Sequence, residues 1–354
     1  MTTKTTLIYS ASCFHHNPGS NHPESANRIK MILSELKKSK ILETNRISLE
    51  EPYSIKIEDL LNVHDYDYVK RVKTICSKGG GFLDDYDTVV SSRSLESALS
   101  AVGGALKAID VVLSRKLSNA FALVRPPGHH AGPNYAKGFC VFNNIALAAT
   151  HLIKNLGFER VVVLDIDAHH GNGTQEIFFD TPEVLFISLH QDPTRFPQTG
   201  YLDEVGESEG IGYTVNIPLP VGTGDYTYNK AINRIIIPII KQYRPEFILV
   251  SAGYDGHYAD PIGELSLSAF SYVRLFGQIR ELASQMCKGR LVAVLEGGYR
   301  LRFLGKLVTS SLAKMAGVPY RIHDRYTSSY CNARNIGDKL IKRVLETQTS
   351  FWKL

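Results

Sequence analysis

The stretch VVVLDIDAHHGNG, residues 161–173, sets four polar side chains directly after an apolar run. The run is typical of a strand buried on both faces of a parallel sheet, because its apolar residues are continuous rather than alternating. Asp165, Asp167, His169 and His170 then follow within six residues. Side chains two apart share one face of an extended segment, so the first three would line up on one side. This segment predicts a parallel sheet with a polar site at one strand end.

Similar apolar runs recur along the chain. They cover residues 5–10, 119–124, 183–189, 213–219, 246–252 and 290–296. Helical patterns lie between many of them, at 29–36, 95–113, 143–157, 228–245, 267–286 and 303–317. This alternation predicts a doubly wound α/β fold with a mostly parallel sheet flanked by helices. We expect a single domain over residues 1–354, because no repeat, low-complexity tract or linker interrupts the chain.

The composition is that of a globular chain with a mild charge. Of 354 residues, 44% are apolar, and the formal net charge is +5. From Lys288 onward, 13 Lys and Arg stand against 4 Asp and Glu. We interpret this basic end as a solvated helical face, since no nucleic-acid motif accompanies it. Nucleic acid is therefore not an expected partner, and a homo-oligomer is left open.

Targeting and cysteine signals are weak. No stretch of about 18 apolar residues suggests a membrane span, and the first residues are too polar for a signal peptide. A cytoplasmic location is the expectation, with secretion by another route left open. Five cysteines, Cys13, Cys76, Cys140, Cys287 and Cys331, are far apart without a C-x-x-C pair. Neither a disulfide framework nor a thiolate zinc knuckle is predicted.

Polar groups follow five of the predicted strands at the same end. They are His129 and His130; Asp167 and His169; His190, Gln191 and Asp192; Asp255 and His257; and Glu296 with Tyr299. Binding sites in open α/β sheets lie outside the carboxyl ends of the strands. Five polar strand ends at one rim therefore predict an active site.

The spacing of Asp167 and His169 suits two ligands of one metal ion. A third ligand must come from another strand end, and Asp255 is the best candidate. Two carboxylates and one imidazole suit a borderline divalent cation, zinc first. Three protein ligands leave one coordination position open, which is typical of a catalytic site. The alternative is a set of satisfied polar groups in a turn.

The chain resembles the class II type histone deacetylases and acetylpolyamine amidohydrolases of the arginase–deacetylase superfamily. The resemblance rests on HPESANRI (22–29), VRPPGHHA (124–131), GFCVFNNIALAA (138–149), VLDIDAHHGNGTQEIF (163–178), VLFISLHQ (184–191), ILVSAGYDGHYADPIG (248–263) and LEGGY (295–299), in family order. It covers about residues 5–317. Residues 318–354 are expected to form a C-terminal extension with a helix over 335–347.

This resemblance implies hydrolysis of an acyl amide, with zinc held by Asp167, His169 and Asp255. Its further implied catalytic residues are His129, His130, Tyr299, Asp165 and Asn172. In these implied roles His130 is the general base, and Tyr299 donates a hydrogen bond to the substrate carbonyl. Asp165 bonds His129, which stabilises charge, and Asn172 orients His130.

Potassium is a second cofactor that the resemblance implies. One site would be formed by Asp165, Asp167, His169, Ser188 and Leu189, partly through main-chain carbonyls. Another monovalent site would lie near Phe178, Thr181, Val184 and Tyr213.

A substrate channel is implied as well. Its expected residues are Gly138, Phe139, Phe196, Ile262 and Gly297. Two aromatic faces with a gap suit the methylenes of acyl-lysine, although both rings could instead belong to the core. At the rim, Asp85 or Asp87 could accept hydrogen bonds from the substrate or attract a cation, and a plain acidic loop is the alternative. Arg28 matches a family arginine beneath the site that is linked to acetate egress; its alternative is a salt bridge on a helix surface.

Three other functions compete with a lysine deacylase. An acetylpolyamine hydrolase shares the chemistry, but in one branch an acidic gatekeeper stands where this chain has Ile262. A binuclear manganese ureohydrolase needs more bridging aspartates than this segment supplies. A non-catalytic acyl-lysine reader is disfavoured because every implied catalytic group is present.

Overall fold

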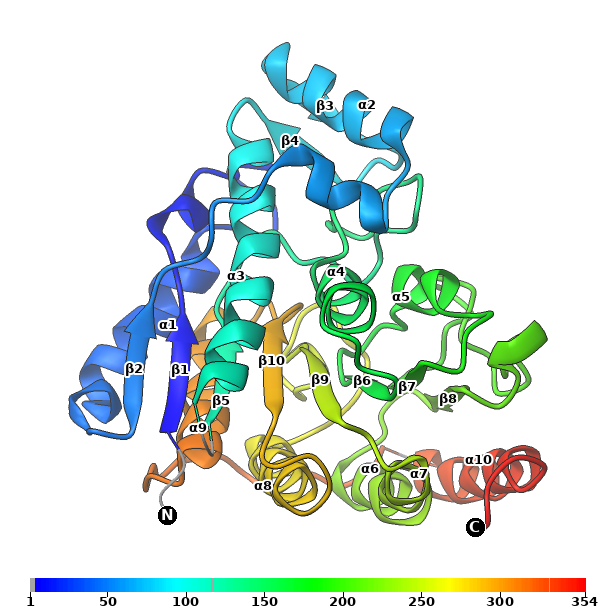
Figure 1. Cartoon of the computed structure of the whole chain (residues 1–354). Helices are drawn as coiled ribbons and strands as arrows, with labels where there is room; N and C mark the ends of the chain where they lie inside the picture. Colours follow the sequence, from blue (N-terminus) through cyan, green and yellow to red (C-terminus); the bar gives the residue numbers. More distant parts are fainter. Residues whose placement is uncertain (1–3, 116–117, 331) are drawn as a thin grey trace.

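The computed structural model describes residues 4–115, 118–330 and 332–354. Its centre is an eight-stranded sheet in the order β2-β1-β5-β10-β9-β6-β7-β8 (Figure 1). The strands are β1 Lys4–Ile8, β2 Ile47–Glu50, β5 Ser118–Ala122, β6 Val161–Asp165, β7 Val184–Gln191, β8 Thr214–Leu219, β9 Phe247–Ala252 and β10 Leu291–Leu295. Every pairing in this sheet is parallel. The predicted α/β class is confirmed.

Helices cover both faces of the sheet, since alternate strand residues point to opposite sides. Val162 and Leu164 pack in a core with α1 (Asn27–Ser39), α6 (Asp225–Ala231), α7 (Ile237–Tyr243), α8 (Ala269–Met286) and α9 (Leu301–Ala316). Val161 and Val163 pack in a second core with α3 (Ser94–Ser114) and α4 (Asn144–Thr150). Continuous apolar runs are therefore required in the central strands.

Helix α3 is long and apolar enough to cross a membrane by length and composition. Here it lies against β5 and α4, and residues such as Ala105 and Ile109 are fully buried in the second core. Burial against the sheet accounts for its composition, as in the core helix of any large α/β domain.

Several elements were not predicted. They are the edge strand β2, the antiparallel pair β3 (Gly80–Phe82) and β4 (Val89–Ser91), helix α2 (Tyr66–Ser77) and the short helix α5 (Asn172–Ile177). β2 has only one fully buried residue, Ile47, so it lacks the apolar run that marks the central strands. The first strand also ends at Ile8, earlier than the expected residue 10.

The C-terminal segment closes against the edge of the sheet. Helix α10 spans Ala333–Gln348, close to the expected 335–347, and packs on β8 and α6. Beyond it, the indole Nε1 of Trp352 donates to the carbonyl of Gly212 at 3.0 Å. Cys13, Cys76, Cys140 and Cys287 are buried free thiols, and Cys331 lies outside the described residues.

Candidate active site

Side chains from four neighbouring strands meet where those strands end. Asp167 and His169 follow β6, Asp255 follows β9, His129 and His130 lie beyond β5, and Tyr299 lies beyond β10. These four strands are adjacent in the sheet. Parallel strands bring their carboxyl ends to one edge, so residues far apart in sequence become neighbours.

The three predicted metal ligands lie together. His169 Nδ1 is 2.8 Å from Asp255 Oδ2 and 3.2 Å from Asp167 Oδ1, and the potential ligand atoms of the three residues all lie within 4.8 Å of one another. The backbone holds both carboxylates in place. Ala168 N–H donates to Asp255 Oδ1 at 2.8 Å, and Gly297 N–H donates to Asp167 Oδ2 at 2.8 Å.

The electrostatics of this cluster suit a bound cation. Burial and the nearby charge of Asp167 raise the pKa of Asp255 to about 7. Two buried carboxylates this close need a positive charge between them. His169 supplies it when no metal is bound, because its contacts with both carboxylates outweigh burial and raise its pKa to about 10; a bound cation would take over that role. Space for the cluster depends on glycine, because a Cβ at Gly253 would lie 2.0 Å from Asp167 Oδ2. The donor set therefore fits a divalent ion.

Two histidines lie beside this cluster with different partners. His129 Nδ1 bonds Asp165 Oδ2 at 2.9 Å, and His130 Nδ1 bonds Asn172 Oδ1 at 2.8 Å. The ring centroids are 3.9 Å apart. Burial disfavours the charged form of His129, but Asp165 and neighbouring carboxylates outweigh it and raise its pKa to about 10. Burial and the adjacent His129 hold the pKa of His130 well below its usual range. The pair thus joins a charged and a neutral imidazole.

Tyr299 faces the same space. Its ring packs edge-on against Phe139 at 5.7 Å between centroids, and the Arg28 guanidinium lies 5.1 Å from its ring centre. Burial raises the pKa of its hydroxyl well above the usual value. The phenol is therefore protonated at neutral pH and available as a hydrogen-bond donor.

A cavity of about 310 Å³ opens onto these groups. Its walls include Gly138, Phe139, Phe196, Ile262 and Tyr299, and His130 and His169 also line it. A Cβ at Gly138 would lie 2.5 Å from the His130 ring, so only glycine leaves room there. The backbone N–H of Gly297, which is not among the residues that line this cavity, donates to Asp167, and its place in the substrate channel stays a prediction.

Three further residues were expected around the channel, namely Asp85 and Asp87 at its rim and Arg28 beneath the site. Asp87 lines the cavity, whereas Asp85 accepts hydrogen bonds from Thr88 N and Gly138 N and so holds its own loop. Arg28 is fully buried, and its salt bridge with Glu24, 3.0 Å from Nη1 to Oε1, is buried as well and does not lie on a helix surface. Its Nε donates to Gly298 O at 2.8 Å, and its Nη2 bonds Glu296 O.

The residues expected at the first potassium site lie at the carboxyl ends of β6 and β7, whereas Val184 of the second expected site begins β7 at the opposite end of the strand. Asp165 and Ser188 are register partners in the β6–β7 pair, and Leu189 follows in β7. At the second expected position, the Tyr213 carbonyl already accepts from Phe186 N–H in the sheet.

Three histidines singled out in the sequence have other partners. His170 bonds Gln175 and Thr199, His190 bonds Ser188 and Gly200, and His257 bonds Asp324 of the C-terminal segment. Asp192 accepts from Thr194 in a local turn.

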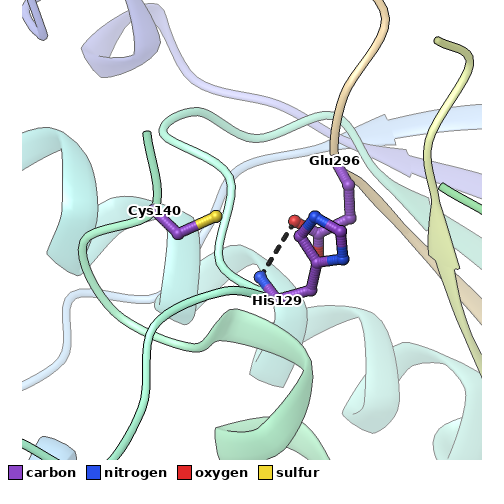
Figure 2. Close-up of side chains that lie close together, drawn as sticks. All are labelled: His129, Cys140 and Glu296. Carbon is purple, nitrogen blue, oxygen red and sulfur yellow. Dashed lines mark hydrogen bonds between the residues drawn. The ribbon is translucent and has the colours of Figure 1, made fainter. Parts of the chain in front are cut away.

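The structure adds a buried carboxylate behind His129. Figure 2 shows the Glu296 side chain next to His129, with Cys140 on the other side of the group. Glu296 Oε2 accepts from Gly128 N and His129 N at 2.8 and 3.2 Å. These bonds occupy the carboxylate, and burial raises the pKa of the Cys140 thiol. We therefore interpret the group as support for the His129 backbone. Its place in LEGGY was visible in the sequence, but its partners were not.

Comparison with known proteins defines the class. A family model described as "Histone deacetylase domain" matches residues 22–315, so the chain belongs to the histone deacetylase family. It is similar to a probable deacetylase of Archaeoglobus fulgidus, 45% identical over 316 residues that cover 88% of this chain and 86% of that protein. It is similar to a histone deacetylase-like amidohydrolase of Pseudomonas aeruginosa, with 35% identity covering 92% and 89%. The crystal structure of the HDA15 HD domain matches with a TM-score of 0.88, at 32% identity over 99% of this chain and 96% of that one.

Proposed function

We propose that this protein is a zinc-dependent deacetylase that removes acetyl or other acyl groups from lysine side chains. The observation that carries the proposal is that Asp167, His169 and Asp255 lie together beside two histidines, and that His130, His169 and Tyr299 line one cavity. The deacetylase names of its relatives support the same reaction. We propose that residues 1–354 form a single catalytic domain.

The donor set supports zinc as the metal. Two carboxylates and one imidazole are ligands that Zn²⁺ accepts, and three protein ligands leave a position for chemistry. When bound there, zinc would polarise the substrate carbonyl and lower the pKa of its water toward about 7.

His130 is the proposed general base. Asn172 Nδ2 lies near the carbonyl of His130 and the Tyr135 hydroxyl, so its Oδ1 faces the ring. His130 Nδ1–H therefore donates to Asn172, which leaves the Nε2 lone pair free. The depressed pKa keeps this ring neutral. It can take a proton from the attacking water and pass it to the leaving amine nitrogen, a role typically worth about 10²–10⁴-fold in rate.

His129 and Tyr299 act on charge rather than by proton shuttling. His129 is protonated and tied to Asp165, so it stabilises negative charge that develops beside His130. The Tyr299 hydroxyl would donate to the developing oxyanion. Both groups are buried, and in such surroundings a fixed donor acts more strongly than in water.

The cavity walls support a long unbranched substrate arm. Phe139 and Phe196 both line the cavity, and the Phe196 ring lies 4.9 Å from that of His130 between centroids. Acyl-lysine can pass its methylenes between aromatic faces while the amide reaches the histidines.

An acetylpolyamine is the second candidate substrate, because Asp87 and Glu264 set two carboxylates at the cavity. Against it, Glu264 is already paired with Arg195 at 2.7 Å, and the Arg195 side chain is 83% exposed there. This ion pair balances the charge of Glu264, so of the two carboxylates that line the cavity Asp87 alone is left to attract a polycation. We place the lysine peptide first for this reason.

The remaining proposals concern ions and location. Potassium would be bound beside the zinc loop by Asp165, Asp167, His169, Ser188 and Leu189, in part through main-chain carbonyls. The second monovalent site near Phe178, Thr181, Val184 and Tyr213 is proposed in the same way. A cytoplasmic location remains our proposal from the sequence.

The test is a deacylation panel with metal analysis. Purified protein is assayed on lysine peptides bearing acyl groups of several lengths, on acetylspermidine and on acetylcadaverine, with and without a chelator. The proposal expects about one zinc per chain, turnover of acyl-lysine above that of polyamines, and loss of activity with the chelator. Full activity without metal, or two manganese ions per chain, would contradict it.

A further inference from the structure

A single carboxylate links the Tyr299 loop to the channel wall. Asp260 Oδ2 accepts from Tyr299 N–H at 2.7 Å and from Arg300 N–H at 3.0 Å. Its Oδ1 accepts from Ile262 N–H at 3.0 Å, with Gly263 N at 3.5 Å. Ile262 and Tyr299 both line the cavity. The side chain therefore spans two strand-end loops that are almost forty positions apart in sequence.

These bonds hold a stretch of backbone that directly follows a glycine with a positive φ. Gly298 precedes Tyr299 with a φ of +115°, a conformation that glycine adopts readily and most residues avoid. Helix α9 begins directly after Arg300, where free N–H groups favour a carboxylate. From the opposite side, Arg28 holds the carbonyl of Gly298. The peptide group between Gly298 and Tyr299 is thus held at both ends: Arg28 binds its carbonyl and Asp260 accepts from its N–H.

We infer that Asp260 is a positioning residue for Tyr299: it holds the hydroxyl at the place where the substrate carbonyl would lie and sets its distance from the Ile262 wall. The inference rests on the proposed function, since it assigns the purpose of the bond to the Tyr299 hydroxyl. Catalytic donors must be held in nearly productive geometry, and a displacement of about 1 Å can cost about 10²-fold. Asp260 itself does not line the cavity and touches no reacting atom.

The test is a double-mutant cycle on the zinc-loaded protein. Asp260→Asn keeps the size of the side chain but puts an N–H where an acceptor is needed. We expect kcat on an acetyl-lysine peptide to fall about tenfold or more, with KM and zinc content within about twofold of wild type. In a Tyr299→Phe background, where no hydroxyl remains to be positioned, the same change should alter kcat by less than about twofold.

Asp225→Asn is the matched control. Asp225 also accepts several hydrogen bonds, from Ser268 N, Ser268 Oγ and Ser271 Oγ, but none from the Tyr299 loop. It should change kcat by the same small factor in both backgrounds. If Asp260→Asn does not fold, Asp260→Glu in both backgrounds replaces it, because it shifts the carboxylate while keeping the charge.

Two results would overturn the inference. One is an unchanged kcat in the wild-type background; the other is an equal loss with and without the Tyr299 hydroxyl, which would mean a structural effect only. Wild-type turnover and its sensitivity to chelator are measured in the same series, so a failure of the proposed function is recognised separately.

Discussion

At the scale of the residue, the role of the Tyr299 hydroxyl can be tested by itself, because the contacts of the ring do not involve the hydroxyl oxygen. Tyr299→Phe removes one oxygen and leaves the packing on Phe139 and Arg28 in place. We expect kcat to fall by roughly 10²–10³-fold, the usual cost of losing one oxyanion donor, while zinc content is unchanged. Steady-state kinetics and metal analysis of the same preparation check this. A kcat close to wild type would remove Tyr299 from the reaction.

His64 provides a pH prediction away from the active site. The ring is 2% exposed, with Nδ1 on the Gly132 carbonyl and Nε2 accepting from Asn143 N–H, both at 2.9 Å. Burial is the main cause that lowers its pKa to about 4. The unfolded histidine, with a pKa near 6.5, takes up its proton first as pH falls. The stability that neutral His64 contributes is therefore complete above about pH 6.5 and is lost as pH falls toward 4.

The measurement is the free energy of unfolding against pH for wild type and His64→Gln. One such proton contributes a slope of at most about 1.4 kcal/mol per pH unit. We expect the wild-type curve to fall more steeply than the variant curve between pH 6.5 and 5, by up to that amount. Parallel curves would show that His64 does not titrate differently in the two states.

Single residues were predicted best where their chemistry is local. Asp167 and His169 are two apart on one segment, so their shared face could be read from spacing. The bonds from Tyr299 to Asp260 and from Gly128 to Glu296 could not, because each joins a carboxylate to a backbone N–H dozens of positions away. A sequence shows which side chains can accept a hydrogen bond, but the fold decides which donors reach them.

At the scale of the element, helix α3 contains a glycine that close packing requires. A Cβ on Gly103 would lie 2.2 Å from the backbone carbonyl oxygen of Tyr53, whose N–H bonds Gly103 O. In an open helix, Gly→Ala stabilises by about 1 kcal/mol. We expect Gly103→Ala to destabilise instead, by about 1–3 kcal/mol, because a backbone atom cannot move aside easily.

The matched control is Gly277→Ala in helix α8. There the new Cβ meets the Lys314 side chain at Cε, 2.7 Å away, and a flexible lysine end can turn away. Its effect should be neutral or stabilising. Denaturant unfolding of both variants measures the difference; equal stabilisation by both would refute the packing argument for α3.

Elements were predictable where both faces are buried. The central strands are continuous apolar runs. Besides the strand at 161–165, each of the six other apolar runs noted in the sequence overlaps a strand. The missed elements, β2 and the β3–β4 pair, lie at edges with exposed residues such as Phe82 and Leu49. Without two buried faces, a short strand has little periodicity to distinguish it from a loop.

At the scale of the whole molecule, strand order was not predictable. β10 lies between β5 and β9 although it is the last strand of the chain. This insertion brings Tyr299 between the histidines after β5 and Asp255, the proposed metal ligand, after β9. Apolar runs of similar composition do not reveal which neighbours they pair with, because that choice depends on how the helices pack across the sheet.

The same arrangement predicts that metal binding stabilises the entire fold. Asp167, His169 and Asp255 come from the ends of β6 and β9, which are hydrogen-bonded neighbours near the middle of the sheet. Without the ion, only the His169 ring lies between the two buried carboxylates to offset their repulsion. An ion that binds only the folded state adds about 2.7 kcal/mol to the free energy of unfolding at a concentration of 100 times its Kd.

Chelator should therefore lower the Tm of the wild-type protein by several degrees, and added zinc should restore it. Asp255→Asn, which lacks one ligand charge, should show a much smaller response to both. If chelator left the wild-type Tm unchanged while zinc was shown to be absent, the cluster would be stable by its own hydrogen bonds and would not need a cation.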